Sequence, residues 1–144
     1  MRLTTRTNIA MRALMYCAVN PGKTVRKADI AVACNASENH LAQVIHLLGQ
    51  RGFLTTLRGR GGGLTLGKPM EDITVGSVFR SLEADVPFAE CFAGDENECP
   101  LRSFCRLRCL LSDALEAFYA KLDTVTLKDL VSDNSGLNAL LKVA

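Results

Sequence analysis

The sequence predicts a mainly α-helical chain, in which a winged helix-turn-helix domain is followed by a long C-terminal dimerisation helix. Three features predict this fold. Two short helical patterns are joined by a few residues, two short strand patterns flank a glycine-rich loop, and an apolar helical repeat of roughly five turns lies near the C-terminus.

The composition is that of an ordinary globular chain. Its 144 residues are 48% apolar, which is enough for one core without a disulfide scaffold. The first residues lack the apolar stretch of a signal peptide, and no run of about 18 apolar residues could span a membrane. We therefore expect a cytoplasmic protein, and a reducing cytosol disfavours disulfides between its six cysteines.

Charge is distributed unevenly along the chain. Residues 1–68 carry ten Lys and Arg against two acidic residues, a net charge of +8, whereas residues 69–144 carry seven against thirteen, a net charge of −6. A basic half suits a polyanionic partner, so DNA or RNA is the working hypothesis. An ordinary solvated basic surface is the alternative.

The first helix is predicted over residues 8–19, where apolar residues recur at helical spacing until a Pro-Gly pair. Thr24 is expected to cap a shorter second helix. Cys17 lies on the apolar side of the first helix and Cys34 lies where the second pattern breaks. Cys17 is interpreted as a small buried side chain, and Cys34 as a packing or turn residue.

The third helix is expected to begin at Ser37, a natural N-cap that accepts hydrogen bonds from the free amides of the first turn. An apolar stripe then leaves a polar, almost uncharged face outward. Side-chain amides suit the reading of base edges, so this helix is predicted to be the recognition helix, with a solvated surface as the alternative. The predicted DNA contacts on it are Ser37, Glu38, Asn39, His40, Gln43 and His46.

A hairpin wing is predicted after this helix. Residues 53–57 and 64–66 are strand candidates, and the loop between them combines glycines with two cations. Such glycines let the backbone approach a phosphate or a narrow minor groove, where arginine is favoured. A phosphate-binding loop is excluded, because Pro69 stands where that motif needs Ser or Thr. The predicted DNA contacts in the wing are Arg58, Arg60, Gly61 and Gly62.

Residues 1–84 thus form the predicted winged helix-turn-helix DNA-binding domain, braced by a short helix over residues 74–83. Residues 85–144 supply a cysteine loop and a long helix over about residues 107–122, which is too apolar to stand alone. Burying this helix against its copy in a homodimer would present two recognition helices to a palindromic operator in double-stranded DNA. A short helix near residues 126–131 and a weakly defined tail complete the chain.

Cys91, Cys99 and Cys105, with Cys109 one helical turn further on, lie in a polar segment that does not suit a hydrophobic core. Thiolates are soft ligands that select zinc, copper(I) or iron-sulfur clusters. The spacing alone permits tetrahedral zinc or an iron-sulfur cluster, and unliganded thiols are the third alternative.

Several motifs carry a resemblance to a known family. They are the opening Met-Arg-Leu-Thr, the Arg-Ala-Leu of the first helix, Ser37-Glu-Asn-His-Leu41, the wing from Arg58 to Gly67, and Cys105-Arg-Leu107. Together they resemble the winged-helix iron-sulfur transcriptional repressors over nearly the whole chain, and within them the nitric-oxide-sensing branch. Ala89 to Phe92 and Cys99 to Leu101 also resemble the rhizobial iron regulators.

The resemblance implies a homodimer with an iron-sulfur cluster, of the four-iron or the two-iron kind, held by Cys91, Cys99 and Cys105. Asn8 stands where the nitric-oxide-sensing branch can carry an acidic ligand, and Cys109 adds a thiol to the usual three. The fourth ligand is therefore open, and its candidates are Asn8, Glu90 and Cys109.

The implied function is a DNA-binding transcriptional repressor whose operator affinity falls when nitric oxide attacks the cluster. An iron-responsive repressor of the same superfamily is the first alternative, and a zinc-stabilised interaction module is the second. An enzyme is not expected, because the sequence has no paired carboxylates, no Ser-His-Asp set and no complete nucleotide-binding motif.

Overall fold

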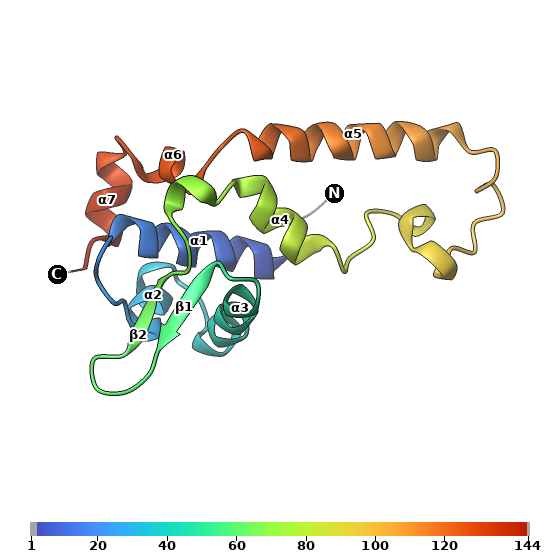
Figure 1. Cartoon of the computed structure of the whole chain (residues 1–144). Helices are drawn as coiled ribbons and strands as arrows, with labels where there is room; N and C mark the ends of the chain where they lie inside the picture. Colours follow the sequence, from blue (N-terminus) through green and yellow to red (C-terminus); the bar gives the residue numbers. More distant parts are fainter. Residues whose placement is uncertain (1–2, 144) are drawn as a thin grey trace.

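The computed structural model describes residues 3–143, so the first two residues of the opening motif, Met1 and Arg2, lie outside the described residues. Figure 1 shows a winged-helix lobe, residues 3–84 and 124–143, from which a cysteine arm, residues 85–123, extends. The elements in chain order are α1 (Thr5–Val19), α2 (Lys27–Ala33), α3 (Glu38–Gln50), β1 (Leu54–Leu57), β2 (Gly63–Leu66), η1 (Met70–Asp72), α4 (Val75–Glu83), η2 (Glu90–Phe92), η3 (Gly94–Glu96), α5 (Arg106–Asp123), α6 (Leu127–Val131) and α7 (Ser135–Leu141). The predicted mainly α-helical class is confirmed.

Threonine caps set the starts of three helices, α1, α4 and α6. The Thr4 hydroxyl accepts a hydrogen bond from the Thr7 amide at 3.3 Å, and α1 therefore begins at Thr5, earlier than the predicted residue 8. Thr74 caps α4 in the same way and accepts a hydrogen bond from the Ser77 amide at 3.0 Å. The predicted place of Thr74 near the start of that helix is confirmed.

The prediction that Thr24 caps the second helix is wrong. Arg26 occupies the cap position of α2, because Val25 first pairs with Leu64 of β2 and the chain turns into the helix only afterwards. Ser37 does occupy the cap position of α3 with an extended backbone, but its hydroxyl accepts no hydrogen bond from the helix. The start of α3 was therefore predicted correctly, and the role of the Ser37 hydroxyl was not.

β1 and β2 form the predicted antiparallel hairpin, within one residue of the predicted strand ends. Leu54 lies opposite Leu66, and Leu57 lies opposite Gly63. The loop closes tightly over the end of β1, since a Cβ on Gly62 would overlap the carbonyl oxygen of Leu57. Glycine at this position is thus required by the close backbone approach.

The core of the lobe is built around α1. Ala10, Ala13 and Leu14 are fully buried, and α1 packs against α3, α4 and α6. Cys17 is buried in this core, as predicted, and Cys34 is buried there too. Burial raises the pKa of the Cys17 thiol to about 12, so this cysteine stays protonated near neutral pH and serves packing.

The C-terminal segment returns to the lobe. α6 is the short helix predicted there, whereas α7 was not predicted from the tail sequence. Leu127, Val131 and Leu141 join the core beside α1. The buried Asn20 side chain donates to the Leu141 carbonyl at 2.8 Å and accepts from the Val143 amide at 2.8 Å, which fixes the end of α7 to the end of α1.

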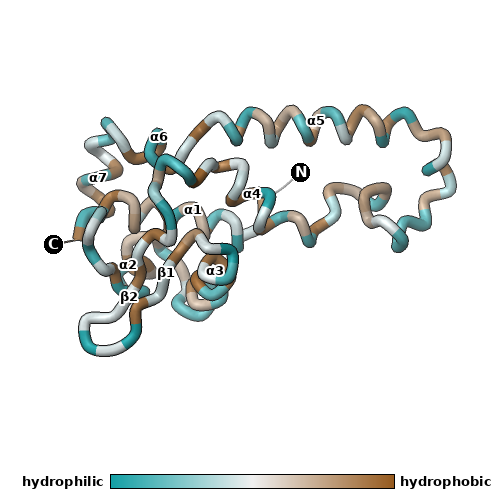
Figure 2. Tube along the Cα trace, viewed as in Figure 1, coloured by the Kyte–Doolittle hydropathy of each residue, from teal (hydrophilic) through white to brown (hydrophobic). Residues whose placement is uncertain are grey.

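The cysteine arm differs from the lobe in its exposure. α5 has no buried residue, although Figure 2 shows apolar positions recurring along its length. Its C-terminal part packs on α4, where the rings of Phe79 and Phe118 lie 6.4 Å apart. None of the helices within residues 3–143 combines the length and the apolar character that crossing a membrane requires.

Candidate functional site

The outward face of α3 carries the predicted DNA-reading side chains. The opposite face of this helix is the buried apolar stripe, and it packs against α1. All of the predicted contacts on this helix are exposed, namely Ser37, Glu38, Asn39, His40, Gln43 and His46. The lobe therefore presents a row of side chains that can hydrogen-bond to the edges of base pairs.

Polar contacts fix the turn between α2 and α3. Lys27 at the start of α2 pairs with Glu38 at the start of α3, with 3.5 Å between Nζ and Oε2. The guanidinium of Arg12 on α1 donates to the carbonyl of Cys34, which caps the C-terminus of α2, at 2.9 Å. The orientation of α3 is thus tied to α1 through α2 as well as directly.

The wing holds two cations at an exposed loop. Arg58 and Arg60 are exposed, and the glycines beside them, Gly59 and Gly61, have φ angles of +92° and +82°. Residues with a Cβ adopt such angles rarely, so the loop shape depends on these glycines. The Gly62 amide donates to the Gly59 carbonyl at 2.9 Å, and this residue therefore shapes the loop from within.

The cysteines of the arm lie around the start of α5. Cys91 lies in η2, Cys99 lies in the following loop and Cys105 directly precedes α5, and all three are half-buried. Cys109 is exposed in the first turn of α5. Their partial exposure distinguishes them from the two core cysteines and leaves the thiols accessible to a metal.

Asn97 organises the cysteine loop, and the sequence analysis missed it. It is the one buried residue of the arm, with 8% of its surface exposed. Its Oδ1 accepts a hydrogen bond from the Cys99 amide at 3.0 Å, and its Nδ2 donates to the Cys91 carbonyl at 3.4 Å. A bond to the amide two residues further on is an Asx turn, and the Asn-Glu-Cys sequence was the signal that could have identified it.

Two arginines tie the loop together from its C-terminal side. Arg102 donates to the Asn97 carbonyl at 3.3 Å, and Arg108 of α5 donates to the Cys91 carbonyl at 3.1 Å. Both arginines bind backbone oxygens, so their contribution is to hold Cys91 and Asn97 close to the first turns of α5.

The donor set fits a soft metal or an iron-sulfur cluster, because three accessible thiols share one loop whose backbone is cross-linked by hydrogen bonds. The thiols are not assembled into a site, since no three Cys, His, Asp or Glu side chains within residues 3–143 are grouped closely enough to hold a metal ion. The assignment of Cys91, Cys99 and Cys105 as ligands therefore stays a prediction.

The candidates for a fourth ligand lie on three different elements, and all are exposed. Asn8 belongs to α1 of the lobe, whereas Glu90 starts η2 beside Cys91 and Cys109 lies in the first turn of α5. The fourth position thus stays open among these three residues.

Glu83 joins the lobe to the arm, and it too was missed from the sequence. It is the last residue of α4, and its Oε1 accepts hydrogen bonds from the Thr4 amide at 3.2 Å, the Thr4 hydroxyl at 2.7 Å and the Thr7 hydroxyl. Burial alone would raise the pKa of this carboxyl, but the hydrogen bonds from Thr7 and Thr4 outweigh burial and hold the pKa below its ordinary value. An ionised Glu83 therefore fastens the start of α1 to the base of the arm.

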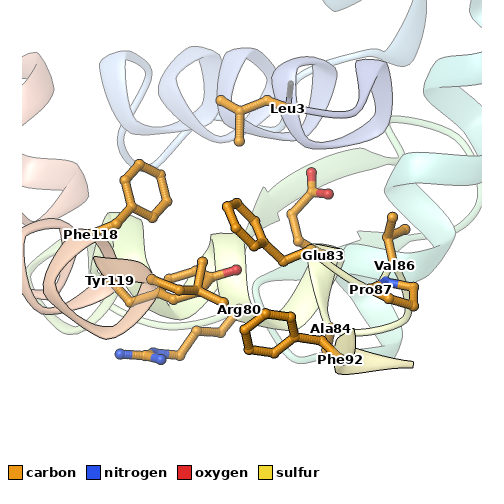
Figure 3. Close-up of a pocket in the computed structure, with 11 residues that line it drawn as sticks. Leu3, Arg80, Glu83, Ala84, Val86, Pro87, Phe92, Phe118 and Tyr119 are labelled. Atoms are coloured by element: carbon orange, nitrogen blue, oxygen red, sulfur yellow. The ribbon is translucent and has the colours of Figure 1, made fainter. Parts of the chain in front are cut away.

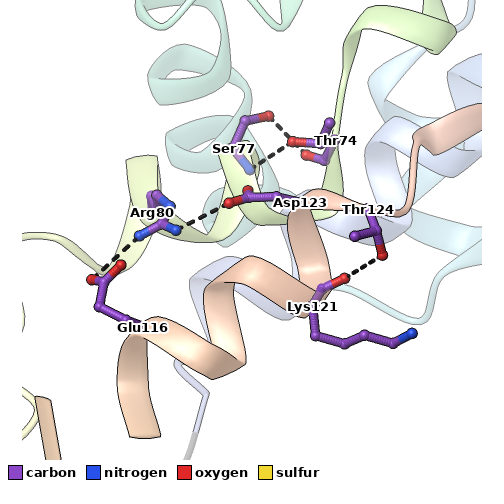
Figure 4. A network of polar contacts seen from close by, with 7 residues as sticks. All are labelled: Thr74, Ser77, Arg80, Glu116, Lys121, Asp123 and Thr124. Carbon is purple, nitrogen blue, oxygen red and sulfur yellow. Dashed lines mark hydrogen bonds and ion pairs between the residues drawn. The ribbon is translucent and has the colours of Figure 1, made fainter. Parts of the chain in front are cut away.

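The other end of the arm is fastened to α4 as well. Arg80 lies between the carboxylates of Asp123 and Glu116 (Figure 4), with N–O distances of 3.0 Å and 3.8 Å. Its guanidinium lies 4.3 Å from the centre of the Tyr119 ring. Gly76 permits this approach, since a Cβ there would overlap the Asp123 carboxylate. Both ends of the arm therefore leave the lobe at α4.

A cavity of about 370 Å³ lies where the arm leaves the lobe. Figure 3 shows apolar side chains gathered around it, together with the charged side chains of Glu83 and Arg80. The apolar lining residues are Leu3, Ala84, Val86, Pro87, Phe88, Phe92, Leu115 and Phe118. An open apolar hollow of this kind is typical of a surface covered by another chain.

The helix-turn-helix, the wing and the long separate helix define a winged-helix transcriptional regulator. The chain belongs to the Rrf2 family, whose model is described as an iron-dependent transcriptional regulator and matches residues 3–133.

The relatives agree with this assignment. The chain is 43% identical to the HTH-type transcriptional regulator NsrR of Geobacillus kaustophilus, over 99% of this chain and 97% of that protein. It is 42% identical to NsrR of Bacillus subtilis over 99% of both chains. The solved structure of CymR, the global cysteine regulator of B. subtilis, is similar with a TM-score of 0.69 and 28% identity, over 92% of this chain and 97% of that one.

These similarities bear on the predicted function. The expected resemblance to winged-helix repressors is confirmed, and the chain is a DNA-binding transcriptional repressor at this level of description. Because its family and relatives are transcriptional regulators, the expectation that it is not an enzyme is confirmed as well.

Proposed function

We propose that this protein is a homodimeric repressor whose affinity for a palindromic operator is controlled by an iron-sulfur cluster that senses nitric oxide. The observation that carries the proposal is the set of three half-buried thiols in one hydrogen-bonded loop at the start of α5, in a chain similar over its full length to NsrR regulators. A reducing cytoplasm would keep these thiols available for iron.

Cys91, Cys99 and Cys105 would hold the cluster, with Asn8, Glu90 or Cys109 as the fourth ligand. An iron-sulfur cluster supplies iron that binds small molecules such as nitric oxide. The chain contributes the rest. Asn97 fixes the backbone of the loop between the first two thiols, and Arg108 fixes the loop to α5.

Exposure of the arm supports the homodimer. Phe104, Leu107 and Leu110 are 95%, 59% and 64% exposed. Phe104 directly precedes the cap of α5, and Leu107 and Leu110 lie in its first turns, in a helix without buried residues. If the α5 helices of two copies packed against each other around a two-fold axis, the dimer would cover these side chains and the apolar cavity. Each copy would supply the same surface to the interface. It would also place two α3 helices at a fixed spacing, which suits two half-sites of a palindrome.

A path for coupling the loop to DNA binding runs through Glu83 and α1. Glu83 lies at the base of the arm, holds Thr4 and Thr7 at the start of α1, and α1 packs against α3. A change in the loop that moves the end of α4 would therefore also move the helix that supports the recognition helix. Such a change shifts DNA affinity only to the extent that the two loop states differ in their affinity for DNA.

The test is anaerobic purification followed by analysis of iron and sulfide per chain. DNA affinity is then measured during titration with nitric oxide, on a sequence that the protein selects from a random pool. We expect visible absorption that bleaches together with loss of DNA affinity. Cys99→Ser should abolish both the visible absorption and the DNA affinity, whereas the matched core variant Cys17→Ala should retain both properties. A colourless anaerobic protein that contains zinc and binds the same DNA with and without its metal would refute the proposal.

The dimer is tested separately. Leu110→Glu should convert the protein from dimer to monomer in analytical ultracentrifugation, because it places a charge in the proposed apolar interface. Lys121→Gln changes charge on the same helix outside this patch and serves as the control. A monomeric wild-type protein would contradict the homodimer.

An iron-responsive repressor is the second candidate, and the description of the family as iron-dependent favours it. The same titration distinguishes the two signals. Loss of DNA affinity on treatment with an iron chelator, but not at an amount of nitric oxide stoichiometric with the cluster, would establish iron as the signal.

A further inference from the structure

We propose that Lys23 and Arg26, at the entry to α2, bind the DNA backbone as a second phosphate contact that is rigidly joined to the wing. The inference rests on the DNA-binding function and extends it to residues outside the recognition helix and the hairpin loop. Its ligand is the phosphate backbone of double-stranded DNA, and it contributes affinity without reading sequence.

The cations of α1 are used inside the protein and are not free for this role. Arg6 donates to the Leu82 carbonyl, and Arg12 donates to the Cys34 carbonyl at 2.9 Å. By contrast, Lys23 and Arg26 are exposed, and neither forms an ion pair within the part of the chain that the structure describes. Lys23 and Arg26 at the entry to α2 therefore add two exposed positive charges to those of Arg58 and Arg60 in the wing.

Acidic residues oppose this surface only weakly. Residues 1–68 contain two acids, Asp29 and Glu38, and Glu38 is engaged by Lys27 at 3.5 Å. Lys27 thus neutralises Glu38, which leaves Asp29 as the one acid of residues 3–68 without an ion pair, against the two cations Lys23 and Arg26. A polyanion that approaches α3 and the wing meets these two cations with little repulsion from carboxylates.

The segment is fixed to the wing through its backbone. The Val25 amide donates to the Leu64 carbonyl at 3.0 Å, and the Leu64 amide donates to the Val25 carbonyl at 2.8 Å. Figure 1 shows α2 beginning beside β2, in agreement with this pairing. A Cβ on Gly63 would overlap the Val25 carbonyl oxygen, so the close approach is built into the sequence.

This pairing gives the two cations a defined position relative to the wing. Val25 lies between Lys23 and Arg26, and its partner Leu64 lies four residues beyond Arg60. A solvated basic surface would need no such attachment. A wing that enters a groove would instead carry Lys23 and Arg26 to the neighbouring phosphates in a fixed register.

The experiment compares wild type with the double variant Lys23→Ala/Arg26→Ala over a range of salt concentrations, on both the selected DNA and an unrelated duplex. Removing one phosphate contact should reduce the slope of log affinity against log salt by about 1, so the slope of the double variant should fall by about 2. Its affinity should fall equally on both duplexes. Lys121→Ala, an exposed cation on α5, is the matched control and should leave the slope unchanged.

Ethylation of DNA phosphates provides a second readout. It should weaken wild-type binding at phosphates flanking those contacted by Arg60, and this interference should disappear in the double variant. An unchanged salt slope and unchanged interference in a variant that unfolds like wild type would overturn the inference alone. Absence of wild-type DNA binding at any salt concentration would overturn the proposed function together with it.

Discussion

The lobe and the arm are stabilised in different ways. The lobe buries the apolar side chains of α1, α3, α4, α6 and α7 in one continuous core, and hydrogen bonds of the buried Asn20 fix the end of α7 to α1. The arm buries a single residue, Asn97, and exposes the apolar side chains at the start of α5. The lobe is therefore packed as a single chain, whereas the arm leaves apolar side chains and thiols exposed.

Under the proposed function, this difference would place sensing and DNA reading in separate regions. A rigid lobe can keep α3 and the wing in a constant arrangement, while a weakly packed arm can respond to a ligand at little cost in stability. α4 connects them, through Glu83 at one end of the arm and Arg80 at the other. Variants in the lobe, at the joint and in the arm should therefore have distinct effects.

The largest effect is expected in the core of the lobe. Leu14→Ala removes a fully buried side chain and should lower the free energy of unfolding by about 3 kcal/mol, through reduced burial and the cavity that remains. Urea denaturation measures it. Leu140→Ala, at a side chain that is 78% exposed on α7, is the control and should change the free energy by less than about 0.5 kcal/mol. Equal effects would show that the lobe lacks a specifically packed core.

A smaller effect is expected where α7 is fastened to α1. Asn20→Ala removes an amide that bonds to the Tyr16 and Leu141 carbonyls and to the Val143 amide, and it leaves those groups without partners. The free energy of unfolding should fall by about 2 kcal/mol. Hydrogen exchange should show the loss concentrated at the end of α7. The exposed Asn39→Ala is the control, and unchanged protection of the Val143 amide would contradict the role given to Asn20.

Features that depend on nearby residues could be predicted from the sequence, whereas contacts between distant residues could not. Local spacing predicted the apolar face of α3, the hairpin and the long helix, because each depends on residues close together in the chain. The hydrogen bonds that join α4 to α1 and α7 to α1 depend on residues far apart in the sequence. Thr4 and Glu83 are 79 positions apart, and Asn20 and Val143 are 123 apart, so no local pattern reports either contact.

Contacts that form only in the folded chain also account for the errors at helix ends and in the candidate site. Thr24 has the composition of a cap, but pairing of Val25 with Leu64, in a distant strand, decides where α2 begins. The cysteines of the loop could be recognised as donors from their residue type. The buried contacts of Asn97 depend on the folded loop, and only its Asx turn leaves a local signal.

An intermediate effect, dependent on pH, is expected at the joint. Because the pKa of Glu83 is lower in the folded protein than its ordinary value of 4.5, its stabilising contribution is fully present above that pH and is lost as the pH falls through the lowered pKa. Glu83→Gln should lower the free energy of unfolding by about 1.5 kcal/mol at neutral pH, and wild type and variant should converge in acid. Glu90→Gln, at an exposed carboxyl of the arm, is the control. A constant difference between wild type and variant across the acid range would contradict this role.

The smallest effect on stability is expected in the arm, for Asn97→Ala. Asn97 bonds to the backbone of Cys91 and Cys99 but contributes nothing to the core of the lobe, so the free energy of unfolding of the metal-free protein should change by less than about 0.5 kcal/mol. Loss of a group that orients metal ligands typically weakens metal binding about tenfold or more. Iron retained per chain during anaerobic dialysis against a chelator should fall accordingly. Asn134→Ala, in the lobe, is the matched control and should retain iron as wild type does. If Asn97→Ala destabilised the metal-free protein as strongly as Asn20→Ala, the arm would be part of the same folding unit as the lobe, and the division between a complete lobe and an incomplete arm would fail.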